Sequence, residues 1–415
     1  MLFKDVIGQQ TVKQHLVDIV HQNRISHALL FLGKEGAGAL PLALAFAQYV
    51  SLLPNENAAS APVDLFAGPS LFGDEPAAPV IKTEIQKPST PDEADGFMQQ
   101  QPAFAKANSY IHPDIHYSFP VIPKKSGDKP VSADYISEWR EFIKLHPYGN
   151  VYDWLQFINA ENKQGNITAE ECGDIIRKLS LKSFESSHKV LVMWMPEYLG
   201  KEGNKLLKLI EEPPANTLFL LVASNEEQIL PTILSRCQLV KVNAFIPQEI
   251  SAALTERAGI AQEQAMQVAA IAQGNYHNAL QLLQHNEEDW QALLRDWLNA
   301  VLRTGPEAQT KWVEEISRLG REKQKQFLLY FIHILRQSLH LRILGDNANG
   351  IEGSERDMAA RLNKITSVSQ QQAIVHEASE SMYHIERNAN AKILFHALTI
   401  KIYHIIQNKT LILAE

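Results

Sequence analysis

The chain lacks the features of several protein classes. Its 415 residues contain two cysteines, Cys172 and Cys237, which exclude a disulfide framework and a four-cysteine zinc site within this chain. The N-terminal MLFKDVIGQQ has no apolar core of a signal peptide. The longest apolar run, ALPLALAFA from Ala39, is far shorter than the roughly 18 residues that a membrane span needs. We therefore expect a reduced, cytoplasmic protein.

A basic excess is also absent. The formal net charge is −8, so any contact with nucleic acid has to come from a local patch. Apolar residues make up 45% of the chain, which is enough to build cores, and the length predicts two or three domains.

Short apolar runs alternate with helical patterns up to residue 245. Residues 188–195 are a continuous apolar run, typical of a central strand of a parallel sheet, and residues 27–33, 217–224 and 238–242 are interpreted as further buried strands. Between them the spacing predicts helices from Pro41 to Leu53 and after Thr168, where Thr168 and Glu171 have the pattern of a capping box. Strands that alternate with helices predict an α/β domain with a parallel sheet.

Two other stretches have a different character. Residues 54–106 are rich in Pro, Ala, Ser and acids and have few large apolar residues, so we expect a disordered insertion. After Phe245 the pattern is helical to the end of the chain. There the apolar stripe of residues 290–302 and the run FLLYFIHIL, 327–335, predict a helical bundle with 327–335 in its central helix.

The stretch GKEGAGAL, residues 33–40, lies between the first predicted strand and the first predicted helix. Gly33 and Gly38, with Gly36 between them, have the spacing of the phosphate-binding loop G-x-x-x-x-G-K-[ST]. Ala39 and Leu40 take the places of the lysine that contacts phosphates and the hydroxyl that contacts Mg²⁺. We expect that the glycines serve the turn and its packing, and that the loop does not bind ATP.

Further segments occur in a fixed order around this loop. They are FKDVIGQQTVKQHL (3–16), NKLLKLIEEPPANTLFLLV (204–222), ILSRCQLV (233–240) and, more weakly, ERNANAKILF (386–395). Together they resemble the AAA+ subunits of clamp loaders, and within that group the delta-prime subunits of bacterial DNA polymerase III. The resemblance implies a P-loop NTPase-like AAA+ α/β domain with a parallel sheet in residues 1–245, a helical lid in 246–286, and an all-α collar for oligomer assembly in 287–415.

The resemblance also locates the family's nucleotide-contacting positions. The family's strand-end acids correspond to Trp194 and Met195, and Glu197 is the nearest acid. The sensing polar residue corresponds to Ser224 or Asn225. The lid arginine corresponds to His277. With the loop lysine and hydroxyl missing as well, a triphosphate and its metal would have no charged contact, and backbone amides alone seldom replace hydration. The resemblance thus implies a degenerate site, with no cofactor or metal bound by this chain.

Arg236 is the one chemical group of the family that remains. In the resembled subunits, the arginine of the Ser-Arg-Cys motif, here Ser235-Arg236-Cys237, projects into the ATP site of the adjacent subunit. Such an arginine finger stabilises charge on the γ-phosphate, with effects of about 10³–10⁵ on rate in other phosphoryl-transfer systems. The simpler alternative is an arginine that caps a helix or pairs with a surface acid.

The implied function is non-catalytic support of sliding-clamp loading. The implied partners are gamma/tau-like ATPases and delta, the sliding clamp and primer-template DNA, with ATP and Mg²⁺ in the neighbouring subunits. The chain would then lack ATPase activity while belonging to the DNA polymerase III holoenzyme, a nucleotidyltransferase. Two alternatives stay open: an ATP-hydrolysing AAA+ protein with an unusual nucleotide site, and an interaction scaffold unrelated to replication.

The remaining candidates favour structural roles. The two cysteines have no base nearby in sequence and are interpreted as small core residues. Pro113 separates His112 from His116, and no further metal ligand is close to them. Glu211 and Glu212 are interpreted as the end of a helix near a subunit interface. The lysines and arginines of IIRKLSLK and NKLLKL fit solvated helix faces, with DNA contact as the alternative.

The expected insertion has two further features. Many clamp-loader relatives carry a four-cysteine zinc module after the first helix; this chain has none, and the insertion takes roughly its place. The insertion also contains two Leu-Phe pairs, Leu65-Phe66 and Leu71-Phe72, in otherwise polar surroundings. Paired large apolar side chains can anchor in a preformed pocket, so we consider the hypothesis that they dock on the sliding clamp.

Overall fold

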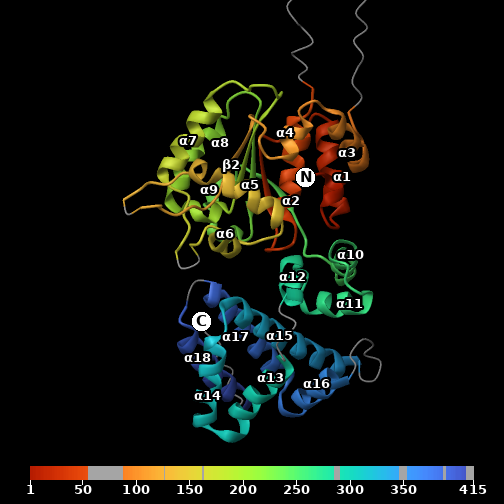
Figure 1. The fold of residues 1–415 in the computed structure, drawn as a ribbon, viewed down its shortest axis with the longest axis vertical. Coiled ribbons are helices and arrows are strands. Elements are labelled where there is room, and N and C mark those ends of the chain that lie inside the picture. Colours follow the sequence, from red (N-terminus) through yellow and green to blue (C-terminus); the bar gives the residue numbers. More distant parts are fainter. Residues whose placement is uncertain are drawn as a thin grey trace, which may run out of the picture. The chain divides into compact units, whose positions relative to one another are not determined.

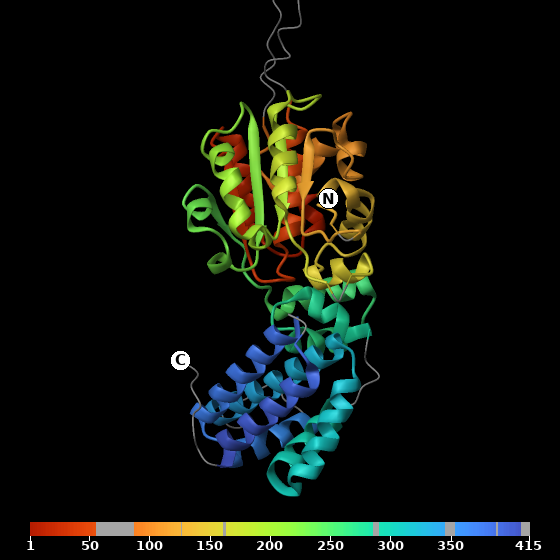
Figure 2. The same cartoon turned by 90° about the vertical axis from the view of Figure 1, so that its left-hand side faces the viewer.

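The computed structural model describes residues 1–54, 87–125, 127–160, 163–284, 290–344, 353–386 and 389–407. The chain forms two compact units, Met1–Phe245 and Ile246–Glu415, shown in Figures 1 and 2. The first is an α/β unit and the second is helical, which is the fold class expected from the sequence. The further division of the helical unit at residue 286 stays a prediction.

The first unit is built on a parallel sheet. Its strands are β1 Ala28–Leu32, β2 Ile115–Ser118, β3 Lys189–Trp194, β4 Thr217–Ala223 and β5 Gln238–Lys241, in the spatial order β2-β3-β4-β1-β5. β1 lies between β4 and β5, with Leu30 opposite Leu221 on one side and Leu239 on the other. The four predicted strands correspond to β1, β3, β4 and β5. The expectation that residues 238–242 form a buried strand was wrong for β5, which lies at the edge of the sheet and of whose residues only Val240 is buried. β2 has no continuous apolar run, and the sequence did not distinguish it.

Successive residues of each strand point to opposite faces of this sheet, and both faces are covered by helices. Leu29 and Phe31 pack into a core with α1–α6, whereas Ala28 and Leu30 pack with α7–α9. Figure 1 shows α1–α4 on one side of the sheet and α7–α9 on the other. These helices are α1 Gln10–His21, α2 Ala39–Ser51, α3 Pro91–Gln100, α4 Phe104–Asn108, α5 Ile136–Leu145, α6 Val151–Phe157, α7 Ala169–Ser180, α8 Leu207–Glu211 and α9 Pro231–Leu234.

The expectation of disorder throughout residues 54–106 was wrong. Residues 91–100 and 104–108 form α3 and α4, and Ala94 and Met98 of α3 are fully buried in the core. Thr90 caps α3 through its hydroxyl, which accepts a hydrogen bond from the Glu93 amide. Residues 55–86, which include both Leu-Phe pairs, lie outside the described residues, so the clamp-docking hypothesis stays untested.

Asp95 ties α3 to the start of the chain. Its buried carboxylate accepts hydrogen bonds from the Phe3 and Lys4 amides at 2.7 and 2.9 Å. Burial raises the pKa of Asp95, while these two amide hydrogen bonds oppose the rise. A polar residue is thus the contact that fixes this helix, in a segment whose composition indicates disorder.

We expect Asp95→Ala to lower the free energy of unfolding by about 2–4 kcal/mol, because two amides lose a charged acceptor. Asp92→Ala is the matched control: Asp92 is an exposed acid in the first turn of the same helix, and its loss should cost roughly 0.3–1 kcal/mol. Urea unfolding of both variants measures the difference. Equal, small losses would show that α3 is not anchored through Asp95.

The second unit consists of helices. They are α10 Pro247–Ala258, α11 Gln262–Ile271, α12 Tyr276–Gln284, α13 Trp290–Asn299, α14 Pro306–Arg318, α15 Arg321–Leu344, α16 Gly353–Ile365, α17 Val368–Glu386 and α18 Ala391–Gln407. The run 327–335 lies in α15 and is buried, as predicted for a central helix. Trp297 and Trp312 stack beside it with ring centroids 4.7 Å apart. Within the described helices, none has both the length and the apolar character needed to cross a membrane.

Candidate functional site

The loop between β1 and α2 keeps its glycines for steric reasons. Gly36 and Gly38 have positive φ angles of 69° and 93°, which favour glycine. A Cβ on Gly38 would lie 3.0 Å from Cζ of Phe245, and a Cβ on Gly33 would lie 2.8 Å from the Val242 carbonyl oxygen. The turn and its packing therefore account for these glycines without any nucleotide.

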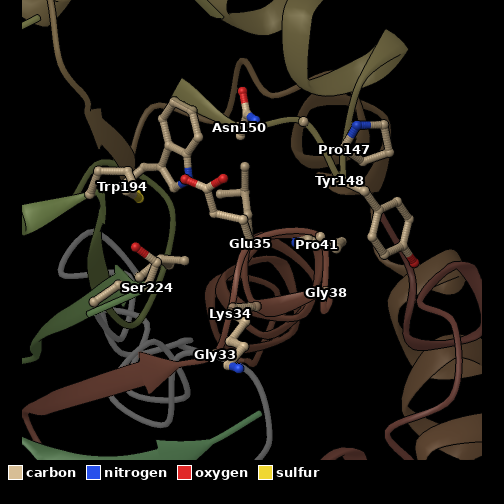
Figure 3. Close-up of a pocket in the computed structure, with 17 residues that line it drawn as sticks. Gly33, Lys34, Glu35, Gly38, Pro41, Pro147, Tyr148, Asn150, Trp194 and Ser224 are labelled. Atoms are coloured by element: carbon tan, nitrogen blue, oxygen red, sulfur yellow. The ribbon is translucent and has the colours of Figure 1, made fainter. Parts of the chain in front are cut away.

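A pocket lies beside this loop at the carboxyl ends of the strands, the edge where open α/β sheets bind ligands. Its cavity volume is about 30 Å³, which is room for roughly two water molecules. It is lined by Gly33, Lys34, Glu35, Gly36, Gly38, Ala39, Leu40, Pro41, Pro147, Tyr148, Gly149, Asn150, Trp194, Met195, Val222, Ala223 and Ser224 (Figure 3). The cavity is small and opens to solvent, so it would enclose little of a triphosphate.

Trp194 and Leu40, at positions where the resemblance implies metal-binding groups, are buried apolar side chains. Trp194 ends β3 and is 4% exposed; its ring centroid lies 5.1 Å from that of Trp139 and 6.1 Å from that of Phe142. The indole is therefore part of an aromatic cluster on α5 and α6. Leu40 is 5% exposed and belongs to the same core. Both positions serve packing.

Glu35 adds a negative charge to the pocket, which the sequence analysis missed. Figure 3 shows its carboxylate pointing toward the indole of Trp194. A carboxylate in this position would repel the phosphates of a nucleotide, since like charges in a confined site disfavour each other. The motif pattern could not identify it, because the loop pattern leaves that position open to any residue.

The polar side chains of the pocket wall are engaged in the fold. The Ser224 hydroxyl donates to Oε1 of Glu197 at 3.2 Å. The Asn150 side chain caps α6 by accepting from the Asp153 amide at 3.0 Å. The Tyr148 hydroxyl accepts from the Ile7 amide at 2.8 Å. These groups hold secondary structure together.

Glu197, the acid nearest to the family's metal-binding position, closes the end of β4. Besides the hydroxyl of Ser224, its Oε1 accepts from the Ser224 and Asn225 amides at 2.6 and 2.9 Å. Burial raises the pKa of Glu197, against the opposing effect of these hydrogen bonds. The structure thus brings Glu197 together with the two sensor-like residues, Ser224 and Asn225. Glu197 binds these two residues and does not line the pocket. Met195, which does line it, has a φ of 58° and marks the turn after β3.

His277, at the position of the lid arginine, belongs to the second unit. It is 8% exposed in α12, and its Nε2 lies 2.9 Å from Nε2 of Gln281. A buried, partly engaged imidazole differs chemically from the charged arginine of an active lid.

Arg236 follows α9, whose Ile233 is buried against the sheet while Arg236 reaches the surface with its side chain 33% exposed. Its Nη1 donates to the Thr232 carbonyl oxygen at 2.6 Å and to the Ser235 hydroxyl at 3.1 Å. Its Nη2 forms an ion pair with Glu211. Glu211 belongs to the segment 204–222 and Arg236 to the segment 233–240, so two of the segments that carry the resemblance are in direct contact.

Similarity to known proteins agrees with the segments discussed above. The sequence profile of the family described as "DNA polymerase III, delta subunit" matches residues 53–245. The DNA polymerase III subunit delta' of Haemophilus influenzae is 29% identical over 161 residues, which cover 38% of this chain and 46% of that protein. Subunit tau of Bacillus subtilis is 24% identical over 286 residues, 68% of this chain and 37% of that protein. Over the matched parts the chain is thus similar to DNA polymerase III subunits of the delta' and tau type.

The family match falls almost wholly within the first unit, the one with the parallel sheet. The matched regions span about half or less of the length of these curated relatives. A solved DNA polymerase III gamma-subunit-related protein of Thermotoga maritima is similar over 96% of this chain and 99% of its own, at 15% identity and a TM-score of 0.35.

The other candidate residues of the chain contact neighbouring residues of the fold. Cys172 is buried; Cys237 is half-buried, and burial raises the pKa of its thiol to about 11. His112 is buried, and its Nδ1 accepts from the Asp114 amide at 3.2 Å. Among the described residues, no group of three or more His, Cys, Asp or Glu side chains is arranged to hold a metal ion. Lys178 of IIRKLSLK pairs with Asp174 at 2.6 Å.

We expect Glu197→Ala to lower the free energy of unfolding by about 1–3 kcal/mol, because the Ser224 and Asn225 amides lose their acceptor. Glu197→Gln keeps an oxygen acceptor and should cost less than about 1 kcal/mol at neutral pH. Urea unfolding of the isolated chain compares the two variants. A similar loss for both would show that the charge of Glu197, rather than its acceptor oxygen, stabilises the end of β4.

The stability difference between Glu197→Gln and the wild type should depend on pH. Because the pKa of Glu197 is higher in the folded state than its ordinary value of 4.5, its contribution to stability is largest below that value and is lost as the pH rises through the folded pKa. Glutamine does not titrate. The stability of Glu197→Gln relative to the wild type should therefore increase from pH 4 to pH 7, and a decrease would contradict the raised pKa.

Proposed function

We propose that this chain is a non-catalytic, delta-prime-like subunit of the DNA polymerase III clamp loader. In this role it binds no ATP or Mg²⁺ and directs Arg236 into the ATP site of a neighbouring subunit. The ATP-driven loading of the sliding clamp onto primed DNA then depends on this chain for structure and for one cation. The curated delta', gamma and tau relatives support the assembly, and the proposed location is the cytoplasm.

The observation that carries the proposal is the filled nucleotide pocket. A cavity of about 30 Å³ beside the loop, bounded by Leu40, Trp194 and the carboxylate of Glu35, encloses little volume for a triphosphate, and its one lysine, the exposed Lys34, lies next to Glu35 in the loop. Each of these three residues opposes nucleotide binding for a different reason. Leu40 lacks the hydroxyl that binds the metal, Trp194 fills space, and the carboxylate of Glu35 repels phosphates. The alternative of an ATP-hydrolysing protein would require all three to be overcome together.

Arg236 supports the second half of the proposal. It is held at the surface of a domain whose own pocket has no use for it, and its exposed ion pair with Glu211 is of the kind that contributes at most about 1 kcal/mol. Such a pair leaves part of the guanidinium open to solvent. The guanidinium therefore has the exposure that a trans role needs.

The experiment that tests the assembly is reconstitution. The chain is mixed with gamma- or tau-type ATPase subunits and delta, and clamp loading on primed DNA is measured with and without it. The proposal predicts a stable complex that contains this chain, and loading that requires it. A complex that forms and loads clamps equally well without the chain would exclude this function.

A further inference from the structure

We propose that Glu211 is a positioning residue for the guanidinium of Arg236. This inference rests on the proposed trans role of Arg236 and adds to it a second residue, which acts through the arginine and not on the nucleotide. It follows from the contact between the end of α8 and the turn after α9.

Two of the three guanidinium nitrogens of Arg236 have partners within the domain, and these partners come from different elements. The Thr232 carbonyl and the Ser235 hydroxyl hold Nη1, and both come from the turn that carries the arginine. Glu211 holds Nη2 from a different helix, so it is the contact that sets the direction of the side chain. Nε contacts no group within the described parts of the chain. Nε–H and one N–H of Nη2 thus stay available for an anion.

Both partners of the ion pair are fixed to the core of the domain. Ile210, immediately before Glu211, and Ile233, in α9, are each 1% exposed and belong to one core cluster. A Cβ on Gly203 would lie 3.0 Å from Leu230 and 3.1 Å from Ile233, so α9 is closely packed against the segment that precedes α8. The ion pair therefore joins two rigid points.

A fixed guanidinium is useful for catalysis in a neighbouring site. A free arginine side chain has many rotamers, and ordering it at the moment of reaction opposes transition-state stabilisation. An arginine that is already directed loses less freedom on meeting the γ-phosphate. Glu211 can supply this direction while the open nitrogens meet the phosphate.

Glu212 provides a matched control on the same helix end. It is also an exposed glutamate, yet its side chain makes no contact with Arg236. Glu211→Gln and Glu212→Gln remove the same charge one residue apart. If net charge or the helix terminus matters, both variants should change ATP hydrolysis equally. If Glu211 positions Arg236, only Glu211→Gln should change it.

The experiment measures steady-state ATP hydrolysis by the reconstituted complex with wild-type chain, Glu211→Gln, Glu212→Gln, Arg236→Ala and the double variant Glu211→Gln/Arg236→Ala. We expect Glu211→Gln to lower kcat by about three- to tenfold with little change in KM for ATP. Glu212→Gln should match the wild type. The double variant should be no slower than Arg236→Ala, because Glu211 acts only through the arginine.

The outcomes separate this inference from the proposed function. If Arg236→Ala leaves ATP hydrolysis unchanged, the trans role itself is wrong. If Arg236→Ala lowers hydrolysis but Glu211→Gln matches Glu212→Gln, only the positioning role is overturned. A rise in kcat for Glu211→Gln would also overturn it, since Glu211 would then restrain the finger. Additive losses in the double variant would assign Glu211 a separate role.

Discussion

Replacing Arg236 by alanine should lower the ATP turnover of the adjacent clamp-loader subunit by at least about 100-fold while this chain stays folded and assembled. Removing an arginine finger in related phosphoryl-transfer systems has effects of about 10³–10⁵ on rate. The loss comes from a missing cation opposite the γ-phosphate, and not from packing, because the Arg236 side chain is 33% exposed. Its ion pair with Glu211 should contribute at most about 1 kcal/mol to folding.

The measurement needs a complex in which the other ATPase sites are inactivated, so that turnover reports the site next to this chain. Thermal unfolding of the isolated chain and gel filtration of the complex serve as controls for folding and assembly. Arg236→Lys is the conservative variant: lysine keeps the charge but lacks the planar fork, and it should restore only a small part of the activity. Unchanged turnover with the alanine variant would leave Arg236 with its surface ion pair as its only role.

The strands were predicted correctly where their environment leaves a strong pattern. β3 and β4 are covered by helices on both faces, so every position is apolar or nearly so, and a continuous run results. α3 was missed because only a few of its residues, such as Met98, pack into the core, and one of its contacts is the carboxylate of Asp95, which composition counts as polar. Tertiary hydrogen bonds of this kind hold the segment to the domain, and composition cannot reveal them.

The candidate site was only partly predictable for a similar reason. Ala39, Leu40 and Trp194 could be found by comparison with the family motif, because the motif specifies which chemistry belongs at those positions. Glu35 occupies a position that the motif leaves free, and only the structure shows its carboxylate in the pocket. The contact between Glu211 and Arg236 joins segments that are separate in the sequence, and it depends on how α8 and α9 pack.

The pocket leads to the second large effect, which is the absence of nucleotide binding. A fluorescent ATP analogue with Mg²⁺, titrated into the isolated chain, should show no saturable binding below about 1 mM, which corresponds to an affinity of about −4 kcal/mol. A gamma- or tau-type subunit is the positive control. Saturation at micromolar analogue would contradict both the filled pocket and the non-catalytic function.

Restoring the loop should not restore ATP hydrolysis. The double variant Ala39→Lys/Leu40→Thr brings back the phosphate and magnesium groups of the loop. Trp194 would still fill the position of the strand-end acids, held in place by Trp139 and Phe142, and Glu35 would still oppose the phosphates. We therefore expect no hydrolysis by the double variant. A gain in binding when Glu35→Gln is added would measure the electrostatic share of the block. Hydrolysis by the double variant alone would show that the two loop side chains were the whole defect.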